Sequence, residues 1–249
     1  MKGVFIHNQL EIRVEVAGEE FSQGDEVSCT LSVGNHANEG REVQGRLELV
    51  LGDCAKVKKK SDTAVQTVSA AELGGPFITA PQEKESRSWS FFLDRNCAVS
   101  EKSQSLYVLY GEAGDSGALE LLPLSVKPHT HIQQVLMLLE SSFQFVVRGV
   151  KSSHGWVNAR CRPPAARRYS FVEELTLGFH FDPPVMQVKY SFRVKKIQAS
   201  SSSVGVKKGR TEVAQTLAEQ EYLLSGDHIN HRFFEEKIEE ALSEVVTGL

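Results

Sequence analysis

The sequence predicts a mainly β protein made of two antiparallel β-sandwiches in tandem. A helix opens the second half, and an amphipathic helix lies at the C-terminal end. Two observations predict this class. Short runs of alternating apolar and polar residues recur between turns rich in Gly, Asn, Asp and Ser, which is typical of sandwiches rather than of alternating β/α units. Only two stretches change to a helical period. The 249 residues suffice for two domains of about 100 to 125 residues.

The first half holds the clearest strand patterns. Residues 10–16 (LEIRVEV) place apolar side chains on one face and charged side chains on the other, as in a half-buried strand. A turn containing Gly18 and Gly24 follows, and residues 27–33 (VSCTLSV) alternate again. Further strands are predicted over residues 43–52, 85–93, 103–113 and 119–128.

A helix is predicted over residues 130–143, at the start of the second half. Its apolar residues follow the spacing i, i+3, i+4, i+7 and i+11, the pattern of one helix face; they are Ile132, Val135, Leu136, Leu139 and Phe143. Thr130 is the expected N-cap because its hydroxyl suits that position. Pro123 and Pro128 mark the boundary, so we expect domains over residues 1–127 and 128–249.

The rest of the second half is predicted to be strands followed by a terminal helix. Alternation predicts strands over residues 143–150, 156–162, 171–181 and 185–197. Residues 199–209 indicate a loop or a weak edge strand, and the role of residues 199–230 stays open. A helix near residues 231–246 is expected, capped by Asp227 or Asn230. Its apolar face either docks on the second half or forms a homodimer, so the chain is expected to be a monomer or such a homodimer.

Charge is distributed unevenly over the chain. The net charge is −4, which argues against wholesale nucleic-acid binding. Residues 1–126 hold 12 basic and 19 acidic residues, a net of −7, whereas residues 127–249 hold 16 and 13, a net of +3. A basic half favours acidic partners or an anionic membrane surface.

The compartment is expected to be the cytoplasm. The start of the chain, MKGVFIHNQL, lacks the continuous apolar segment of a secretory signal, and no apolar run approaches 18 residues. The four cysteines form no CxxC pair and are expected to be free thiols.

Several of these segments resemble arrestin-type sandwiches. FSQGDEVSCTLSV at residues 21–33 resembles the Gly-acidic turn and second strand of that fold, and SWSFFLDRNCAVSEKSQSLYVLYGEA at residues 88–113 is similar to its later N-domain strands. KPHTHIQQVLMLLE at residues 127–140 is similar to the start of the C-terminal half in bacterial sporulation-control proteins of the arrestin-like (Spo-zero-M) family. The resemblance ends near residue 198.

This resemblance implies two arrestin-like sandwiches and a regulator that is not an enzyme. Arrestin-like proteins are mostly adaptors that bind other proteins or membrane surfaces. The resemblance therefore implies an adaptor that acts by protein–protein interaction, without cofactors. A fold alone does not fix a function, so neither the partner nor a role in sporulation follows.

Two histidine pairs offer an alternative in another class, a metal-dependent hydrolase. His129 and His131, with His228 and His231, could supply four nitrogen ligands to zinc. No acidic residue lies at the spacing that a catalytic motif such as HExxH requires. The simpler interpretation places each pair at the start of a helix.

Basic clusters in the second half are the candidate site for an anionic partner. If they converge on one face, they would attract an anionic lipid or a phosphorylated protein. Aromatic residues do not alternate with these clusters, which argues against binding of single-stranded nucleic acid. The cluster residues are Arg160, Arg162, Arg167, Arg168, Lys195, Lys196, Lys207, Lys208 and Arg210.

Overall fold

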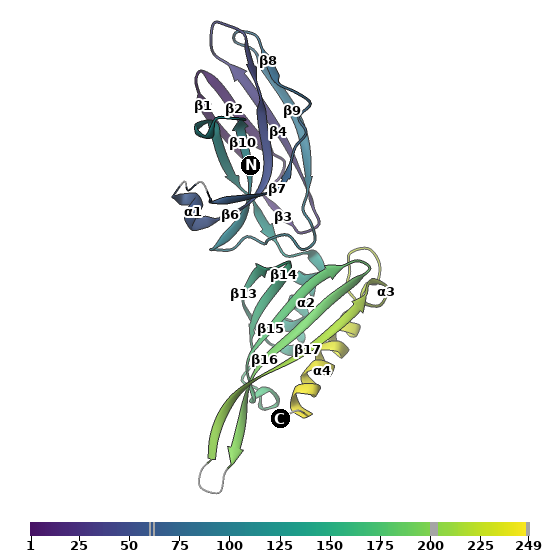
Figure 1. Ribbon diagram of the computed structural model, residues 1–249. Coiled ribbons are helices and arrows are strands. Elements are labelled where there is room, and N and C mark those ends of the chain that lie inside the picture. The colour runs from purple at the N-terminus through teal and green to yellow at the C-terminus, as the bar shows by residue number, and fades with distance from the viewer. Residues whose placement is uncertain (60, 62, 200–203, 248–249) are drawn as a thin grey trace. The chain divides into compact units, whose positions relative to one another are not determined.

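The computed structural model describes residues 1–59, 61, 63–199 and 204–247, and at residues 116, 196–199, 204–207 and 246–247 it describes the backbone alone. The chain divides into two compact units, Met1–Lys127 and Pro128–Leu249. Both are shown in Figure 1. The prediction of a mainly β protein is confirmed.

The first unit is a sandwich of two four-stranded antiparallel sheets. One sheet has the order β1-β2-β4-β9, and the other has the order β11-β10-β6-β7. The strands of the first sheet are β1 (Lys2–His7), β2 (Leu10–Val16), β4 (Glu26–Asn35) and β9 (Lys84–Phe92). Those of the second are β6 (Gly45–Asp53), β7 (Val65–Ala70), β10 (Gln104–Glu112) and β11 (Leu119–Pro123).

Short elements complete the first unit. The strand β3 (Glu20–Ser22) pairs in parallel with β12 (Ser125–Lys127), and β5 (Arg41–Val43) pairs with β8 (Phe77–Thr79). A helix α1 (Cys54–Lys58) begins after Asp53, whose carboxylate caps it, and a 3-10 turn η1 spans Ser116–Ala118.

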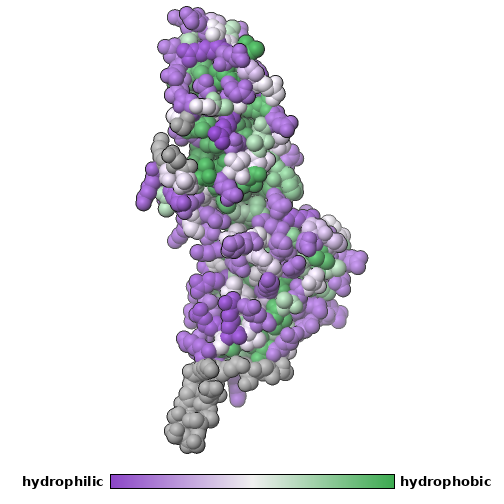
Figure 2. All heavy atoms as spheres, viewed as in Figure 1, coloured by the Kyte–Doolittle hydropathy of each residue, from purple (hydrophilic) through white to green (hydrophobic). Residues whose placement is uncertain are grey.

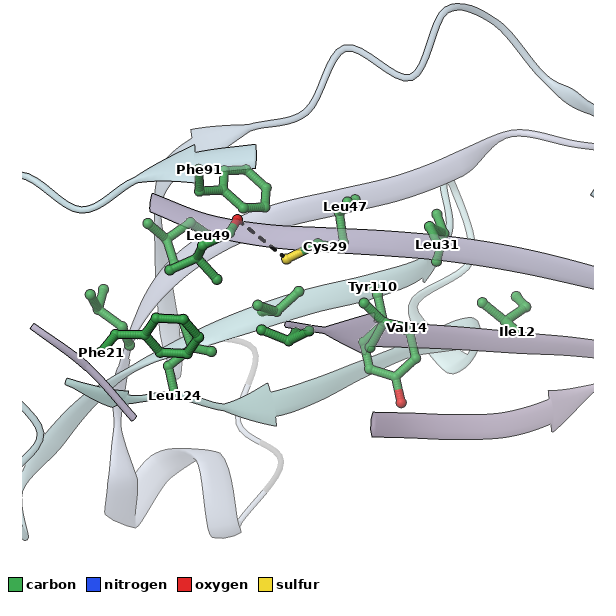
Figure 3. Close-up of a cluster of buried hydrophobic side chains, with 14 of the residues drawn as sticks. Ile12, Val14, Phe21, Cys29, Leu31, Leu47, Leu49, Phe91, Tyr110 and Leu124 are labelled. Atoms are coloured by element: carbon green, nitrogen blue, oxygen red, sulfur yellow. Dashed lines mark hydrogen bonds between the residues drawn. The ribbon is translucent and has the colours of Figure 1, made fainter. Parts of the chain in front are cut away.

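Alternating side chains from both sheets form the core of the first unit. Ile12, Val14 and Leu31 come from one sheet, and Leu49 and Val108 come from the other. All five are buried, and Figure 3 shows side chains of this cluster between the sheets. The period-2 pattern of the sequence therefore identifies the inward face of these strands.

The second unit is built on a single five-stranded antiparallel sheet with the order β13-β14-β15-β16-β17. Its helices α2 and α4 lie on one face of this sheet (Figure 1). The strands are β13 (Val146–Ser153), β14 (Trp156–Arg162), β15 (Val172–Asp182), β16 (Val185–Ala199) and β17 (Val204–Ala218). The remaining elements are α2 (Thr130–Phe143), α3 (Glu219–Tyr222), α4 (His231–Thr247) and a 3-10 turn η2 (Arg167–Tyr169).

The second unit differs from the prediction of a second sandwich. Within the residues that the structure describes, helices rather than a second sheet cover the inner face. Phe179, Tyr190 and Phe192 are buried on that face, and Leu139 and Phe234 of the helices are buried as well. The apolar stripes of two helices provide the same apolar layer that a second sheet would provide.

Both predicted helices are confirmed, with one correction. The helix α2 spans Thr130–Phe143, but His129 rather than Thr130 is its N-cap, because the His129 ring accepts a hydrogen bond from the His131 backbone. The helix α4 begins at His231, and Asn230 Oδ1 accepts from the Phe233 N–H at 3.2 Å. Its apolar residues are buried within the chain, including Phe234 and Ile238.

The strand β17 agrees with the edge-strand alternative and extends beyond it. Residues 204–209 of the segment expected to be a loop or weak edge strand open a 15-residue strand that is paired with β16 along its whole length, and residues 200–203 lie outside the described residues. As an edge strand it buries few side chains, such as Val213 and Leu217. Its apolar alternation is therefore weak.

Candidate functional site

The outer face of the five-stranded sheet carries the candidate site. Side chains alternate along each strand, so the residues between the buried positions of β14, β15 and β16 point away from the helices. In the space-filling view, hydrophilic residues predominate over this sheet (Figure 2). We call the following residues the basic outer face: Lys151, Arg160, Arg162, Glu173, Glu174, Lys189, Arg193, Lys195, Lys208, Arg210 and Glu212.

The basic outer face has eight cations and three carboxylates, a difference of five positive charges. Arg160 Nη2 lies 2.6 Å from Glu174 Oε2, and Arg210 Nε lies 3.0 Å from Glu212 Oε1. Glu173 lies 3.6 Å from the Nζ atoms of both Lys195 and Lys208. Each such surface pair contributes about 0–1 kcal/mol to stability. The main effect of these pairs is therefore to fix the positions of the charged side chains on this face.

Arg193 lacks a carboxylate of its own. It is exposed, and among the described residues no carboxylate lies within ion-pair distance of it. Its neighbours across the strands are Glu174 on β15, which pairs with Arg160, and Arg210 on β17. The next outward pair is Lys195 with Lys208. Like charges directly opposite one another destabilise a strand pair. The β16–β17 pair therefore concentrates positive charge at a cost to the sheet.

A groove of about 430 Å³ lies over this strand pair. Arg210 Nε also donates to Ser191 Oγ at 2.7 Å, which holds the guanidinium against the groove. The lining residues are Glu174, Thr176, Ser191, Arg193, Lys208, Gly209 and Arg210. The groove thus combines three cations and two hydroxyls with one carboxylate that already pairs with Arg160.

Apart from Arg160, the predicted cations that do not line this groove lie in three places. Arg162, Arg167 and Lys195 line a second hollow of about 490 Å³ beside Pro163 and Pro164. Arg168 lies instead over the Tyr169 ring, at 4.5 Å, and lines a hollow with Phe143 and Glu239 of the helices. The side chains of Lys196 and Lys207 lie outside the described residues, although their backbones pair across the strands.

Three cations of the basic outer face escaped the sequence prediction, which considered only clusters of neighbouring charges. Lys189 and Arg193 are separated by uncharged residues in the strand VKYSFRV, and Lys151 is likewise separated from Arg148 in β13. Their signal is the alternation itself, because the residues between Val188, Tyr190, Phe192 and Val194 must face away from the core.

An aromatic corner lies at the other end of the same face. The rings of Trp156 and His180 stack with centroids 5.3 Å apart, and Lys189 Nζ lies 4.0 Å from the centroid of the indole ring. His180 Nδ1 lies 2.8 Å from the Gly155 carbonyl oxygen. These contacts keep Lys189 at the surface in a defined position.

The histidine pairs lie at helix starts. His129 Nδ1 accepts the His131 backbone N–H at 3.2 Å, and His131 is 2% exposed, packed against the rings of Phe181 and Tyr222. His228 and His231 are exposed. Within the described part of the chain, no three His, Cys, Asp or Glu side chains are grouped so that they could hold a metal ion. The zinc-hydrolase alternative thus has no geometric support there.

The cysteine thiols are free, and burial makes three of them poor nucleophiles. Burial raises the pKa of Cys161 to about 12, and the neighbouring Arg160 and Arg162 point to the opposite side of the sheet. Burial likewise raises the pKa of Cys29 to about 11 and that of Cys97 to about 12. Thiols in this range are protonated at neutral pH and react slowly.

Comparison with solved structures identifies the fold. The crystal structure of Spo0M, the sporulation control protein from Bacillus subtilis, matches with a TM-score of 0.69 at 15% identity, over 96% of this chain and 99% of that one. This chain has the Spo0M fold. The structural match confirms the resemblance that the sequence predicts, and it covers both units.

Other comparisons add no argument about function. A β-glucosidase from Listeria innocua matches over 48% of this chain at 8% identity with a TM-score of 0.32, which is too low to support one. No family model and no curated protein matches the sequence. Within the described residues, no helix is both long and apolar enough to span a membrane.

Proposed function

We propose that the protein is a non-catalytic regulator that acts by binding other proteins through the basic outer face. The observation that carries this proposal is the excess of five positive charges on a sheet face that no helix of the second unit covers. An exposed charged face of this kind raises association rates with oppositely charged partners.

The fold and the chemistry of the side chains support a regulator rather than an enzyme. The protein with the similar structure is named as a sporulation control protein, and we propose a comparable regulatory role here. Two side chains that could do chemistry are buried: His131 is packed against aromatic rings, and burial raises the pKa of Cys161. Four free thiols support a reducing compartment such as the cytoplasm.

The test is cross-linked capture of partners from the native cell with the full chain. Arg160, Arg193 and Arg210 are changed together to Ser, which removes three positive charges from the basic outer face. The matched control changes the exposed residues Ser28, Gln66 and Ser103 to Glu, which alters the net charge equally on the first unit. We expect the arginine variant to lose its partner and the control to keep it.

Two results would contradict the proposal. If both variants capture the same partners in the same yield, the basic outer face is not the contact surface. If elemental analysis of the purified protein finds stoichiometric zinc that is lost in His129→Ala and His231→Ala, the non-catalytic assignment is wrong.

A further inference from the structure

The groove between β16 and β17 shows what kind of partner the basic outer face fits. Arg193 and Arg210 lie directly opposite each other, and Lys208 lies opposite Lys195. Glu174 lies opposite Arg193 on β15 but pairs with Arg160, so within the described residues Arg193 is a groove cation with no ion pair of its own. An anion from outside would remove the repulsion between the opposed cations.

The carboxylates already on this face show how such an anion can be received. Glu212 forms an ion pair with Arg210 at 3.0 Å, and Glu174 accepts a hydrogen bond from Arg160 at 2.6 Å. Both contacts are short charge-assisted pairs between neighbouring positions of the sheet. A partner carboxylate over Arg193 would extend the same pattern.

The spacing of the cations favours an extended chain. Outward positions two residues apart in a strand, such as Lys208 and Arg210, repeat at about 6.6–6.8 Å. A segment in extended conformation with an acidic residue at every second position repeats its carboxylates at the same interval.

We propose that this groove binds an extended acidic segment of a partner protein, whose alternate Asp or Glu side chains pair with Arg193, Lys208 and Arg210. The inference rests on the proposed regulatory function and names its partner chemistry. A membrane surface fits less well, because membrane-binding faces combine basic with apolar side chains. On the described part of this sheet, Val146 is the only large apolar side chain that is exposed.

The test is fluorescence anisotropy with a labelled twelve-residue peptide of alternating Glu and Thr, added to the full chain at low salt. Two comparison peptides have Gln in place of Glu, or the same composition with all glutamates in one block. We expect salt-sensitive binding that is tightest for the alternating peptide. The double variant Arg193→Gln/Arg210→Gln should bind it at least tenfold more weakly, which is about 1.4 kcal/mol.

Arg148→Gln provides a matched control for the site. Arg148 is exposed on β13, at the opposite edge of the same sheet, and a second exposed cation, Arg232, lies on α4. We expect Arg148→Gln/Arg232→Gln, which removes the same charge as the groove variant, to keep the wild-type affinity. Lys208→Gln is a further variant in the groove, and far-ultraviolet circular dichroism establishes that each variant is folded.

Four outcomes would overturn the proposal. These are no binding of the alternating peptide, equal binding of the block peptide, equal weakening by the two double variants, and binding only to phosphatidylserine vesicles. The proposed function fails separately. If Arg193→Gln/Arg210→Gln still captures the cellular partner, the groove is not the binding site, and the proposed function is unaffected. If the wild-type chain binds the peptide but captures no partner from the cell, the proposed function fails, and the assignment of the groove is unaffected.

Discussion

The outer face of the β1-β2-β4-β9 sheet and that of the five-stranded sheet differ in the partners of their polar side chains. In the first unit, hydroxyl groups of β4 and β9 pair across the strands at 2.8–3.1 Å, forming a ladder of three rungs; the pairs are Ser28 with Ser90, Thr30 with Ser88, and Ser32 with Ser86. In the second unit, two rungs of β16 and β17 bring cation against cation, Arg193 with Arg210 and Lys195 with Lys208. The hydroxyl rungs of the first face pair with each other, whereas these cations pair with carboxylates elsewhere on the face or, at Arg193, make no ion pair among the described residues.

The inner faces differ as well. A second sheet covers the inner face in the first unit, and two helices cover it in the second. Because both coverings provide buried apolar side chains, the fold tolerates either layer. The stability of each unit therefore depends on its inner layer, whereas charges on the outer face change the free energy of unfolding only slightly.

The largest expected effect comes from removing part of the helical layer. Phe234 of α4 is fully buried and contacts Tyr222, with ring centroids 5.8 Å apart. Phe234→Ala should destabilise the second unit by about 3–5 kcal/mol, because truncation leaves a cavity. In a Trp89→Phe background, urea unfolding followed by the fluorescence of Trp156 reports the second unit alone.

Glu236→Ala is the matched control on the same helix. Glu236 is exposed and pairs only with Arg232, at 3.0 Å. Its removal should change the free energy of unfolding by no more than about 0.5 kcal/mol. Equal effects of Phe234→Ala and Glu236→Ala would mean that α4 does not serve as the inner layer.

The sequence predicts this layer only in part. The apolar stripe of residues 130–143 and the terminal stripe identify both helices and their buried faces. They do not reveal that the helices replace a second sheet, because an apolar strand face has the same pattern whichever element covers it. The length of the edge strand β17 escaped prediction, because an edge in contact with water needs little alternation.

The candidate site was predictable to a similar extent. Arg160, Lys195, Lys208 and Arg210 lie on one face, a convergence that the sequence left open. The position of Arg193 opposite Arg210 depends on the register of β16 against β17, which the sequence does not specify. Arg168 was wrongly grouped with the face, since the turn η2 directs it toward the helices.

Acid should lower the stability of the first unit, because two carboxylates on its strands pair with arginines. Hydrogen bonds from Arg46 hold the pKa of Glu48 below its ordinary value of 4.5, and Arg87 does the same for Glu85. A pKa lowered by folding stabilises the fold above the unfolded value, and this stabilisation is lost as the pH falls. Urea midpoints measured by Trp89 fluorescence in a Trp156→Phe background should fall between about pH 5 and pH 3.

The double variant Glu48→Gln/Glu85→Gln isolates this contribution. Glutamine cannot ionise, so the midpoint of this variant should depend less steeply on pH over the same interval. An unchanged slope would show that other groups cause the acid sensitivity of the first unit.

A smaller effect of opposite sign is expected at Arg193. Arg193→Thr removes a cation that faces Arg210 and introduces a residue suited to strands. The second unit should therefore become more stable by about 0.2–1 kcal/mol at low salt. The gain should shrink in 1 M salt, where the Debye length is about 3 Å.

Arg160→Thr is the control for this change. It makes the same substitution on the same face but removes a cation that pairs with Glu174 at 2.6 Å. It should leave the unit less stable than Arg193→Thr does. If both variants gain equally, strand preference rather than charge repulsion accounts for the effect at Arg193.

The smallest effect is expected in the hydroxyl ladder of the first unit. Thr30 Oγ1 and Ser88 Oγ are 3.0 Å apart, and a double-mutant cycle with Thr30→Val and Ser88→Ala should give a coupling of about 0.2–1 kcal/mol. Because both partners are neutral, this coupling should be the same at low and high salt, unlike the effect at Arg193. A coupling that weakens in salt would remove the distinction between the two outer faces.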